Sequence, residues 1–176
     1  MSEPGKLYAA TFTPALLLAL KRGLKPLVEA QKGDLILCGD GTLWQKLKQG
    51  HPSRWLCSLG FASLTGTSTQ SSAAEVRINA TVSIASGPVS GEAIEAETLR
   101  LVGLTEMVVA WVLSCRFVDQ TSGEPHDFAD GTRGMRLVQA VPLSLDGIAG
   151  AIAMRATFRQ AIGEPACLET ILCPVP

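Results

Sequence analysis

The sequence predicts one α+β domain over residues 1–176, in which long β-hairpins form an antiparallel sheet and two main helices pack on one side of it. Three observations carry this prediction. Leucines recur at helical spacing after Thr13-Pro14, apolar and polar residues alternate strictly from Val76 to Ile84, and a second apolar run extends from Leu101 to Leu113. No internal repeat and no second core separates these segments, so we expect a single domain.

Composition limits the class of protein. A chain of 176 residues can bury a sizeable core without a disulfide or a metal. Its apolar content of 47% and charged content of 18% are those of a globular protein rather than a disordered one. The formal charge of -1 gives no field that would steer the chain onto nucleic acid or an anionic membrane. We therefore expect no direct nucleic-acid recognition and no membrane partner.

The cysteines and the apolar runs indicate a reducing compartment. Five cysteines occur: Cys38, Cys57, Cys115, Cys167 and Cys173. Their number is odd and none forms a Cys-x-x-Cys pair, so we expect reduced, mostly buried thiols. Cys167 and Cys173, near the terminus, could pair after oxidation, but we expect free thiols there as well. Residues 1–12 show no signal pattern, and the run 101–113 is shorter than the roughly 20 residues that span a bilayer. This places the chain in a cytoplasm or in a particle assembled there.

The first helix is predicted to begin at Thr13-Pro14, because a capping hydroxyl is followed by proline at the first helical position. Its apolar stripe is Leu16, Leu17, Leu20, Leu24, Leu27 and Val28. Gly23 and Pro26 weaken the second half, so the pattern predicts an end or a kink near Leu24.

Short strands and a hairpin follow. The apolar runs Leu35–Cys38 and Leu43–Trp44 flank Gly39-Asp40-Gly41, which predicts a turn between two strands, with an irregular segment from Lys46 to Ser53. The runs Trp55–Leu64 and Glu75–Ser86 predict an antiparallel hairpin with a long tip. Its inward residues are Trp55, Cys57, Leu59 and Phe61 on the first strand and Val76, Ile78, Ala80, Val82 and Ile84 on the second.

The second helix is predicted over Glu92–Leu113, with Ser90 as its cap and acidic residues in its first turns. Its second half is apolar nearly all round, as in a helix sandwiched between layers or covered by a neighbouring subunit. Glu106 is the exception. A buried carboxylate has to be paired, so we expect either a functional acid or, preferably, an ion pair with Arg155 or Arg159 or an interface contact.

The remaining chain predicts a loop and two strands. Residues Asp119–Gly134 are polar and too long for a simple turn, which indicates an exposed functional or flexible loop. Met135–Val141 is predicted as a strand, and the alternation over Gly147–Ile162 predicts a long partner strand. From about residue 163 we expect an extended or frayed C-terminal arm.

Candidate catalytic residues are few. The two histidines, His51 and His126, lie in turn-like contexts, and no Gly-x-Ser-x-Gly elbow is present. The cluster His126, Asp127 and Asp130, with Glu124 before it, could hold a divalent metal. A solvated polar loop explains the same residues more simply, because no helix or strand would fix the ligands. We expect no catalytic, cofactor-binding or metal-binding residue, and hence no enzyme.

Arginines mark the polar face of the predicted sheet. Arg77, Arg155 and Arg159 fall on the wet side of the alternating strands, which suggests intersubunit contacts. With Arg133 and Arg136, the last two could instead form a basic stripe for nucleic acid, but aromatic residues for base stacking are scarce. Intersubunit salt bridges explain the stripe equally well.

The order of these elements resembles a known family. An N-terminal helix, the hairpin, a long helix and two strands follow one another, and the last strand closes with Met154-Arg155-Ala156-Thr157-Phe158-Arg159-Gln160. This outline looks like that of the tail terminator proteins of long-tailed bacteriophages and of phage-derived tail machines. The resemblance implies a small α+β subunit of the virion, assembled in the host cytoplasm, whose hexameric ring caps the tail tube and joins it to the head.

The resemblance implies a structural role without catalysis. Tail tube and neck proteins would be the partners of the homo-oligomeric ring, which would stop tube growth by presenting a surface that the next ring cannot pair with. Two other functions stay open from the residues alone. One is a small metal-dependent enzyme using His126, Asp127 and Asp130, and the other is a small-ligand-binding module with a pocket between the apolar helix and the sheet.

Overall fold

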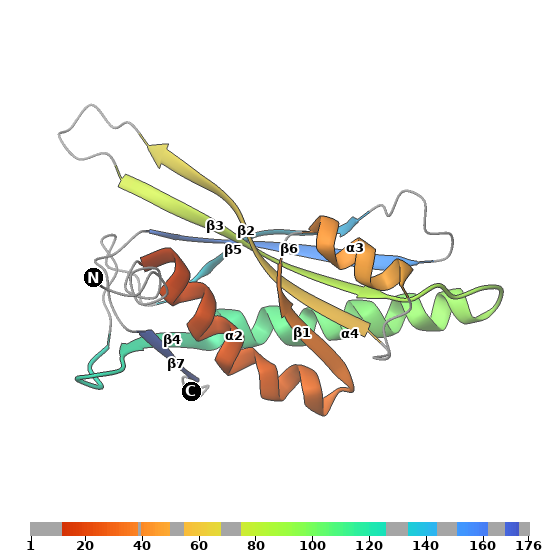
Figure 1. Cartoon of the computed structure of the whole chain (residues 1–176), viewed down its shortest axis with the longest axis horizontal. Helices are drawn as coiled ribbons and strands as arrows, with labels where there is room; N and C mark the ends of the chain where they lie inside the picture. Colours follow the sequence, from red (N-terminus) through yellow and green to blue (C-terminus); the bar gives the residue numbers. More distant parts are fainter. Residues whose placement is uncertain are drawn as a thin grey trace.

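The structure is a computed structural model of the whole chain (Figure 1), and it describes residues 12–38, 40–49, 55–67, 75–125, 134–143, 151–161 and 168–172. The described elements are, in chain order, α2 (Phe12–Ala30), β1 (Gly33–Leu37), α3 (Asp40–Lys48), β2 (Trp55–Thr67), β3 (Glu75–Ser86), α4 (Ala93–Ser114), β4 (Cys115–Asp119), β5 (Arg136–Leu143), β6 (Ile152–Ala161) and β7 (Leu168–Leu172). No helix among these residues is long and apolar enough to cross a membrane.

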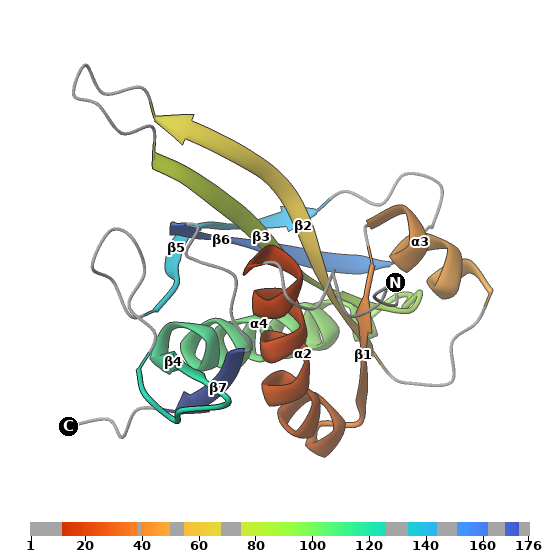
Figure 2. The ribbon, with the colours of Figure 1, turned by 60° about the vertical axis from the view of Figure 1, so that its left-hand side comes forward.

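Five strands form the main sheet in the order β1-β2-β3-β6-β5. Every neighbouring pair is antiparallel except β1 and β2, which run parallel. Helices α2 and α4 cover one face of this sheet, and α3 lies on the other (Figures 1 and 2). The predicted α+β class, with two main helices on one side, is confirmed.

The main core lies between the sheet and the two long helices. Trp55, Cys57 and Leu59 of β2 point into it as predicted, and their partners on β3 are Ser86, Ile84 and Val82. The Trp55 indole donates a hydrogen bond to the Gln31 carbonyl, 2.9 Å away, which fixes the turn after α2. Phe61, predicted to point inward on the same strand, is instead 49% exposed. A register shift between Phe61 and Ser63 marks the place where the regular pairing is interrupted.

The first helix does not stop near Leu24. It continues through Gly23 and Pro26 to Ala30, because Leu24 and Val28 are fully buried on the same stripe as Leu20. This packing outweighs the low helix propensity of the two breakers. Gly23 is also required by its neighbours, since a Cβ at this position would come within 2.7 Å of the Trp111 ring on α4.

The region after β1 differs from the prediction. Leu43–Trp44 is not a strand after a Gly39-Asp40-Gly41 turn, since Asp40–Lys48 forms the helix α3. Leu43 and Leu47, one helical turn apart, are buried in a small second core with Leu56, Ala85 and Ala153. The crossover through α3 also explains why β1 and β2 are parallel, because a parallel pair cannot be joined by a tight hairpin. Of the segment 46–53, expected to be irregular, residues 46–48 are helical, Gln49 follows in a turn, and residues 50–53 lie outside the described part of the chain.

Helix α4 is covered on one side only. Its buried residues are Leu101, Leu104, Thr105, Val108 and Val112. The N-terminal flanking position is Glu92, without a side-chain capping hydrogen bond, so the predicted Ser90 cap is wrong. Leu99, 67% exposed, and Leu113 stay uncovered on the other side of the helix. One side of α4 is therefore buried against the sheet, and the other side exposes apolar residues to solvent.

A small second sheet joins the ends of two segments. Strand β4 follows α4 directly and pairs antiparallel with β7, from Cys115↔Leu172 to Asp119↔Leu168. The segment expected to be an extended or frayed arm thus holds a strand, while residues 162–167 and 173–176 lie outside the described part of the chain. Arg22 on α2 donates a hydrogen bond to the Leu168 carbonyl, 2.8 Å away, and ties β7 to the first helix.

Candidate functional site

The sheet face opposite α2 and α4 carries the arginines that the sequence singles out. Asn79 pairs with Arg159 and Ser83 with Arg155, and Arg77 stands two residues before Asn79. Because paired residues, and residues two apart on one strand, share a face of a sheet, Arg155 and Arg159 occupy the same face. The side chain of Arg77 lies outside the described part of the structure, and the role of all three arginines in intersubunit contacts stays a prediction.

Arg159 is held in place by a short hydrogen-bonded chain. Its Nε donates to Asn79 Oδ1, 3.1 Å away, and Asn79 Nδ2 donates to Ser63 Oγ, 2.9 Å away. Asn79 is itself buried, so this chain fixes the root of the guanidinium group on β3. Among the described residues, the terminal nitrogens of Arg159 have no hydrogen-bond partner, so they can donate to an anion in a defined direction.

Arg136 lies directly across from Arg159. The two are register partners on β5 and β6, and Arg136 is exposed while Arg159 is half-buried. Among the residues that the structure describes, neither arginine has a carboxylate partner within ion-pair distance. Like charges directly opposite each other on a sheet are destabilising unless an anion lies between them. We refer to Arg136 and Arg159 as the arginine patch, and its chemistry is that of an anion-binding surface.

Arg155 belongs to the same face but not to the same cluster. It stands four residues from Arg159 along β6, which corresponds to about 13 Å, and its register partners are Ser83 and Val141. Arg133, the other member of the predicted basic stripe, lies outside the described residues. The pairing of Arg159 with Arg136 is the feature that the sequence pattern did not reveal, because cross-strand register depends on tertiary contacts.

Glu106 is not the buried acid that the sequence suggests. It is exposed on α4 and borders the opening between this helix and β5. The predicted ion pair with Arg155 or Arg159 is wrong, because α4 packs on one face of the sheet and both arginines lie on the other. The physical reason is helical periodicity: Thr105 and Val108 face the sheet, and the next position after Thr105 is turned by about 100°.

An apolar groove runs between α4 and the edge strand β5. Its lining residues are Val102, Thr105, Glu106, Val109, Leu137, Ala140 and Met154, and its volume is about 270 Å³. Leu137 and Val138 on β5, and Leu99 and Ile94 on α4, are exposed apolar side chains on the same two elements. The groove and these side chains together form an uncovered apolar surface beside α4.

The free edge of β5 is protected against pairing with another strand. A register shift at Val138 distorts the strand, and Pro142 has no backbone N–H to donate. Bulges and prolines are the usual devices by which proteins keep an edge strand from recruiting further strands. Contacts made by this edge therefore depend on its side chains more than on its backbone.

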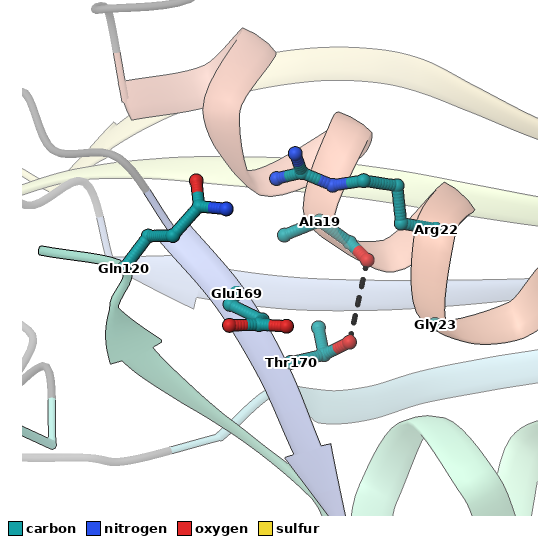
Figure 3. Close-up of a pocket in the computed structure, with 6 residues that line it drawn as sticks. All are labelled: Ala19, Arg22, Gly23, Gln120, Glu169 and Thr170. Atoms are coloured by element: carbon teal, nitrogen blue, oxygen red, sulfur yellow. Dashed lines mark hydrogen bonds between the residues drawn. The ribbon is translucent and has the colours of Figure 1, made fainter. Parts of the chain in front are cut away.

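A second, smaller pocket lies between α2 and the β4–β7 sheet (Figure 3). Ala19, Arg22, Gly23, Gln120, Glu169 and Thr170 line its volume of about 150 Å³. Thr170 Oγ1 donates a hydrogen bond to the Ala19 carbonyl, 3.3 Å away (Figure 3). The Arg22 guanidinium donates to the Leu168 carbonyl. These hydrogen bonds already serve to attach β7 to α2, so the pocket is explained by packing of the small sheet.

The described cysteines are structural. Cys57 and Cys115 are buried, Cys38 is half-buried, and all three are free thiols. Burial raises the pKa of the Cys57 thiol to about 12, because the charged thiolate is poorly solvated in the core. Such a thiol is not a nucleophile near neutral pH. Cys167 and Cys173 lie outside the described residues, so their pairing stays a prediction.

The metal-site alternative falls mainly outside the described residues. His51, His126, Asp127 and Asp130 are all undescribed, and only Glu124 is placed, on an exposed turn. That turn is organised by Asp119, whose Oδ1 accepts hydrogen bonds from the backbone N–H groups of Thr121 and Ser122, both at 2.9 Å. Within the described ranges, no three His, Cys, Asp or Glu side chains are grouped closely enough to hold a metal ion.

Comparison with known proteins adds no family. Neither the protein-family models nor the curated proteins that were searched contain a match to this chain. The features of this chain that bear on its function are the arginine patch, the groove and the protected edge of β5.

Proposed function

We propose that this chain is a structural assembly subunit, and that it acts as a tail terminator or neck protein whose ring caps a tail tube and joins it to the head. The observation that carries the proposal is the uncovered apolar surface around the α4–β5 groove. Exposed apolar side chains gathered beside a groove are typical of a surface that another chain covers. In a homo-oligomeric ring, α4 would be covered on both sides, as its apolar sequence predicts.

The arrangement of elements supports the same proposal. An N-terminal helix, a long hairpin, a long helix and the closing strands occur in the order on which the resemblance to tail terminator proteins rests. The β2–β3 hairpin extends beyond the neighbouring strands at one end of the molecule (Figures 1 and 2). A projecting hairpin is well suited to contact a component above or below a ring.

The protected edge fits the task of ending a polymer. A tube grows when each ring offers the next one a matching surface. A terminator must bind the last ring without offering that surface again. The distorted, proline-containing β5 would permit contacts between side chains and disfavour further growth of the sheet.

The first test is the oligomeric state. Light scattering on the purified protein, combined with negative-stain electron microscopy, should give a discrete ring. Leu137→Glu places a charge in the groove and should shift the protein toward monomers. Leu172→Glu is the matched control, because Leu172 is also an exposed apolar residue but lies on β7, away from the groove. If both variants assemble to the same extent, the groove is not part of the interface between subunits.

The second test is capping. Polymerising tail-tube protein from the same genome, mixed with this chain, should yield tubes that stop growing and carry extra density at one end. Tubes whose growth is unaffected, with a subunit that stays monomeric beside them, would overturn the proposed function.

The groove also favours a second candidate function, a binding module for a small apolar ligand. Its lining is apolar and it lies between the apolar helix and the sheet, as the sequence suggested for this alternative. Its volume of about 270 Å³ is at the small end for a ligand pocket. Saturable binding of an apolar fluorescent probe to monomeric protein, abolished by Ala140→Trp, would favour the module over the assembly subunit.

A further inference from the structure

Two surfaces of opposite charge lie at opposite ends of the molecule. The start of β5 and the end of β6, which carry the arginine patch, lie at one end of the sheet, and the first turns of α4 lie at the other (Figure 1). Glu92 and Glu95 in those turns are exposed and have no cation within ion-pair distance among the described residues. Glu97, by contrast, is paired with Arg100.

The two surfaces cannot neutralise each other within one chain. Helix α4 has 22 residues and is therefore about 33 Å long, which separates its first turns from the arginine patch by several times the Debye length of about 8 Å at physiological salt. Among the described residues, neither end has an oppositely charged partner within ion-pair distance in the monomer. In a second copy, however, the same two ends are available to meet.

We propose that the arginine patch of one copy binds the first turns of α4 in the next copy, so that subunits associate head to tail through Arg136 and Arg159 on one side and Glu92 and Glu95 on the other. This inference rests on the proposed assembly function and names the surfaces that join its subunits. The occupant of the patch is a second copy of this chain, because α4 carries complementary carboxylates that have no cation partner among the described residues, and the formal charge is near zero overall.

The geometry of the patch suits carboxylates. Arg159 is oriented by Asn79, and Arg136 stands across from it, so two guanidinium groups can converge on acids spaced three residues apart on a helix. A carboxylate between the two arginines would also relieve the repulsion of this cross-strand pair.

Apolar side chains border both charged surfaces. Ile94 and Leu99 are exposed in the first turns of α4, and Val138 is exposed on β5 two residues after Arg136. Leu137, between them, is also exposed but lines the groove on the helix side of the sheet. Surface ion pairs alone stabilise an interface little, so these apolar residues supply the part of the contact that excludes water. A contact between two different surfaces is heterologous, and repetition of it closes a ring or gives an open filament.

Charge reversal tests the proposal. The basic-end variant carries Arg136→Glu and Arg159→Glu. The acidic-end variant carries Glu92→Arg and Glu95→Arg. The self-association constant of each variant should be about tenfold or more below that of the wild type. Mixing the two variants in equal amounts, or combining all four substitutions in one chain, should restore assembly, because each reversed surface then meets its complement. Lys48→Glu, an exposed charge reversal on α3, is the control and should leave assembly unchanged.

The outcomes separate this inference from the proposed function. The double variant Arg136→Glu with Arg159→Glu loses the Arg159–Asn79 hydrogen bond, so its folding is checked by circular dichroism. The single variant Arg136→Glu keeps that bond and tests the contact if the double variant misfolds. A wild-type oligomer that persists in every variant overturns the head-to-tail contact but leaves the assembly function standing. A wild-type protein that is monomeric at all concentrations, alone and with tube protein, overturns both. Loss of binding to a labelled DNA duplex in the basic-end variant, with unchanged assembly, would make the patch a phosphate-binding surface instead.

Discussion

The two faces of the sheet use the same strands for different purposes. On the face toward α2 and α4, Ile84, Phe158 and their neighbours are fully buried in one continuous core. On the other face, the residues that alternate with them form a small core under α3 at one end and the arginine patch at the other. One face therefore holds the fold together, whereas the other divides its length between stability and contact with other molecules.

Phe158→Ala should have the largest effect on stability. Phe158 is fully buried between the sheet and the helices, and the substitution leaves a cavity that costs about 3–5 kcal/mol. Chemical denaturation followed by circular dichroism measures this loss. Phe61→Ala, on the half-exposed Phe61, should cost much less, and equal losses would contradict the assignment of the core face.

Leu43→Ala should have an intermediate effect. Leu43 is fully buried, but its core under α3 contains few residues and can relax around the missing atoms, so we expect a loss near the lower end of the range for such substitutions, about 2–3 kcal/mol. The same denaturation experiment applies. A loss as large as that of Phe158→Ala would mean that the two faces contribute equally.

Asn79→Ala should affect contact more than stability. Removing the side chain deletes the hydrogen bonds to Ser63 and Arg159, and we expect a cost of about 1 kcal/mol in the free energy of unfolding. The released Arg159 should weaken self-association in the light-scattering assay. Unchanged association would show that the orientation of Arg159 is not required.

Ionisation of the Cys57 thiol should have the smallest effect of all, because it does not change the stability of the protein near neutral pH. The pKa of its thiol is raised to about 12 in the folded protein from an ordinary value of 9.0, so the folded state retains the proton longer than the unfolded chain does. The resulting stabilisation is present in full below about pH 9 and is lost as the pH rises toward 12. At pH 8 a thiol reagent should modify Cys38 before Cys57, and rapid labelling of Cys57 in native protein would contradict its burial.

The sequence predicted the parts of the fold that repeat with a clear period. Alternation over Glu75–Ser86 identified β3, which lies at the centre of the sheet. The prediction that its polar face is wet was wrong for Asn79 and Ser83, which are 6% and 1% exposed. Helix α3 was missed because Gly39 and Gly41 resemble a turn, while the burial of Leu43 and Leu47 depends on residues far along the chain. The pairing of β4 with β7 was missed for the same reason.

The candidate site was predicted only in part. Alternation placed Arg77, Arg155 and Arg159 on one face, since a period of two assigns faces without knowledge of the partner strands. It could not show that Arg136 is opposite Arg159, because cross-strand register is a tertiary property. The position of Glu106 was misjudged because a helix that is apolar nearly all round does not reveal which side the sheet covers.

Helix α3 stands apart from the rest of the molecule in its attachment. It rests on a core of its own, separated from the main core by the thickness of the sheet. Elements supported by few buried contacts open locally long before the whole protein unfolds. The amide protons of α3 should therefore exchange with solvent through local unfolding of this helix alone, whereas those of β3 should exchange only when the whole protein unfolds.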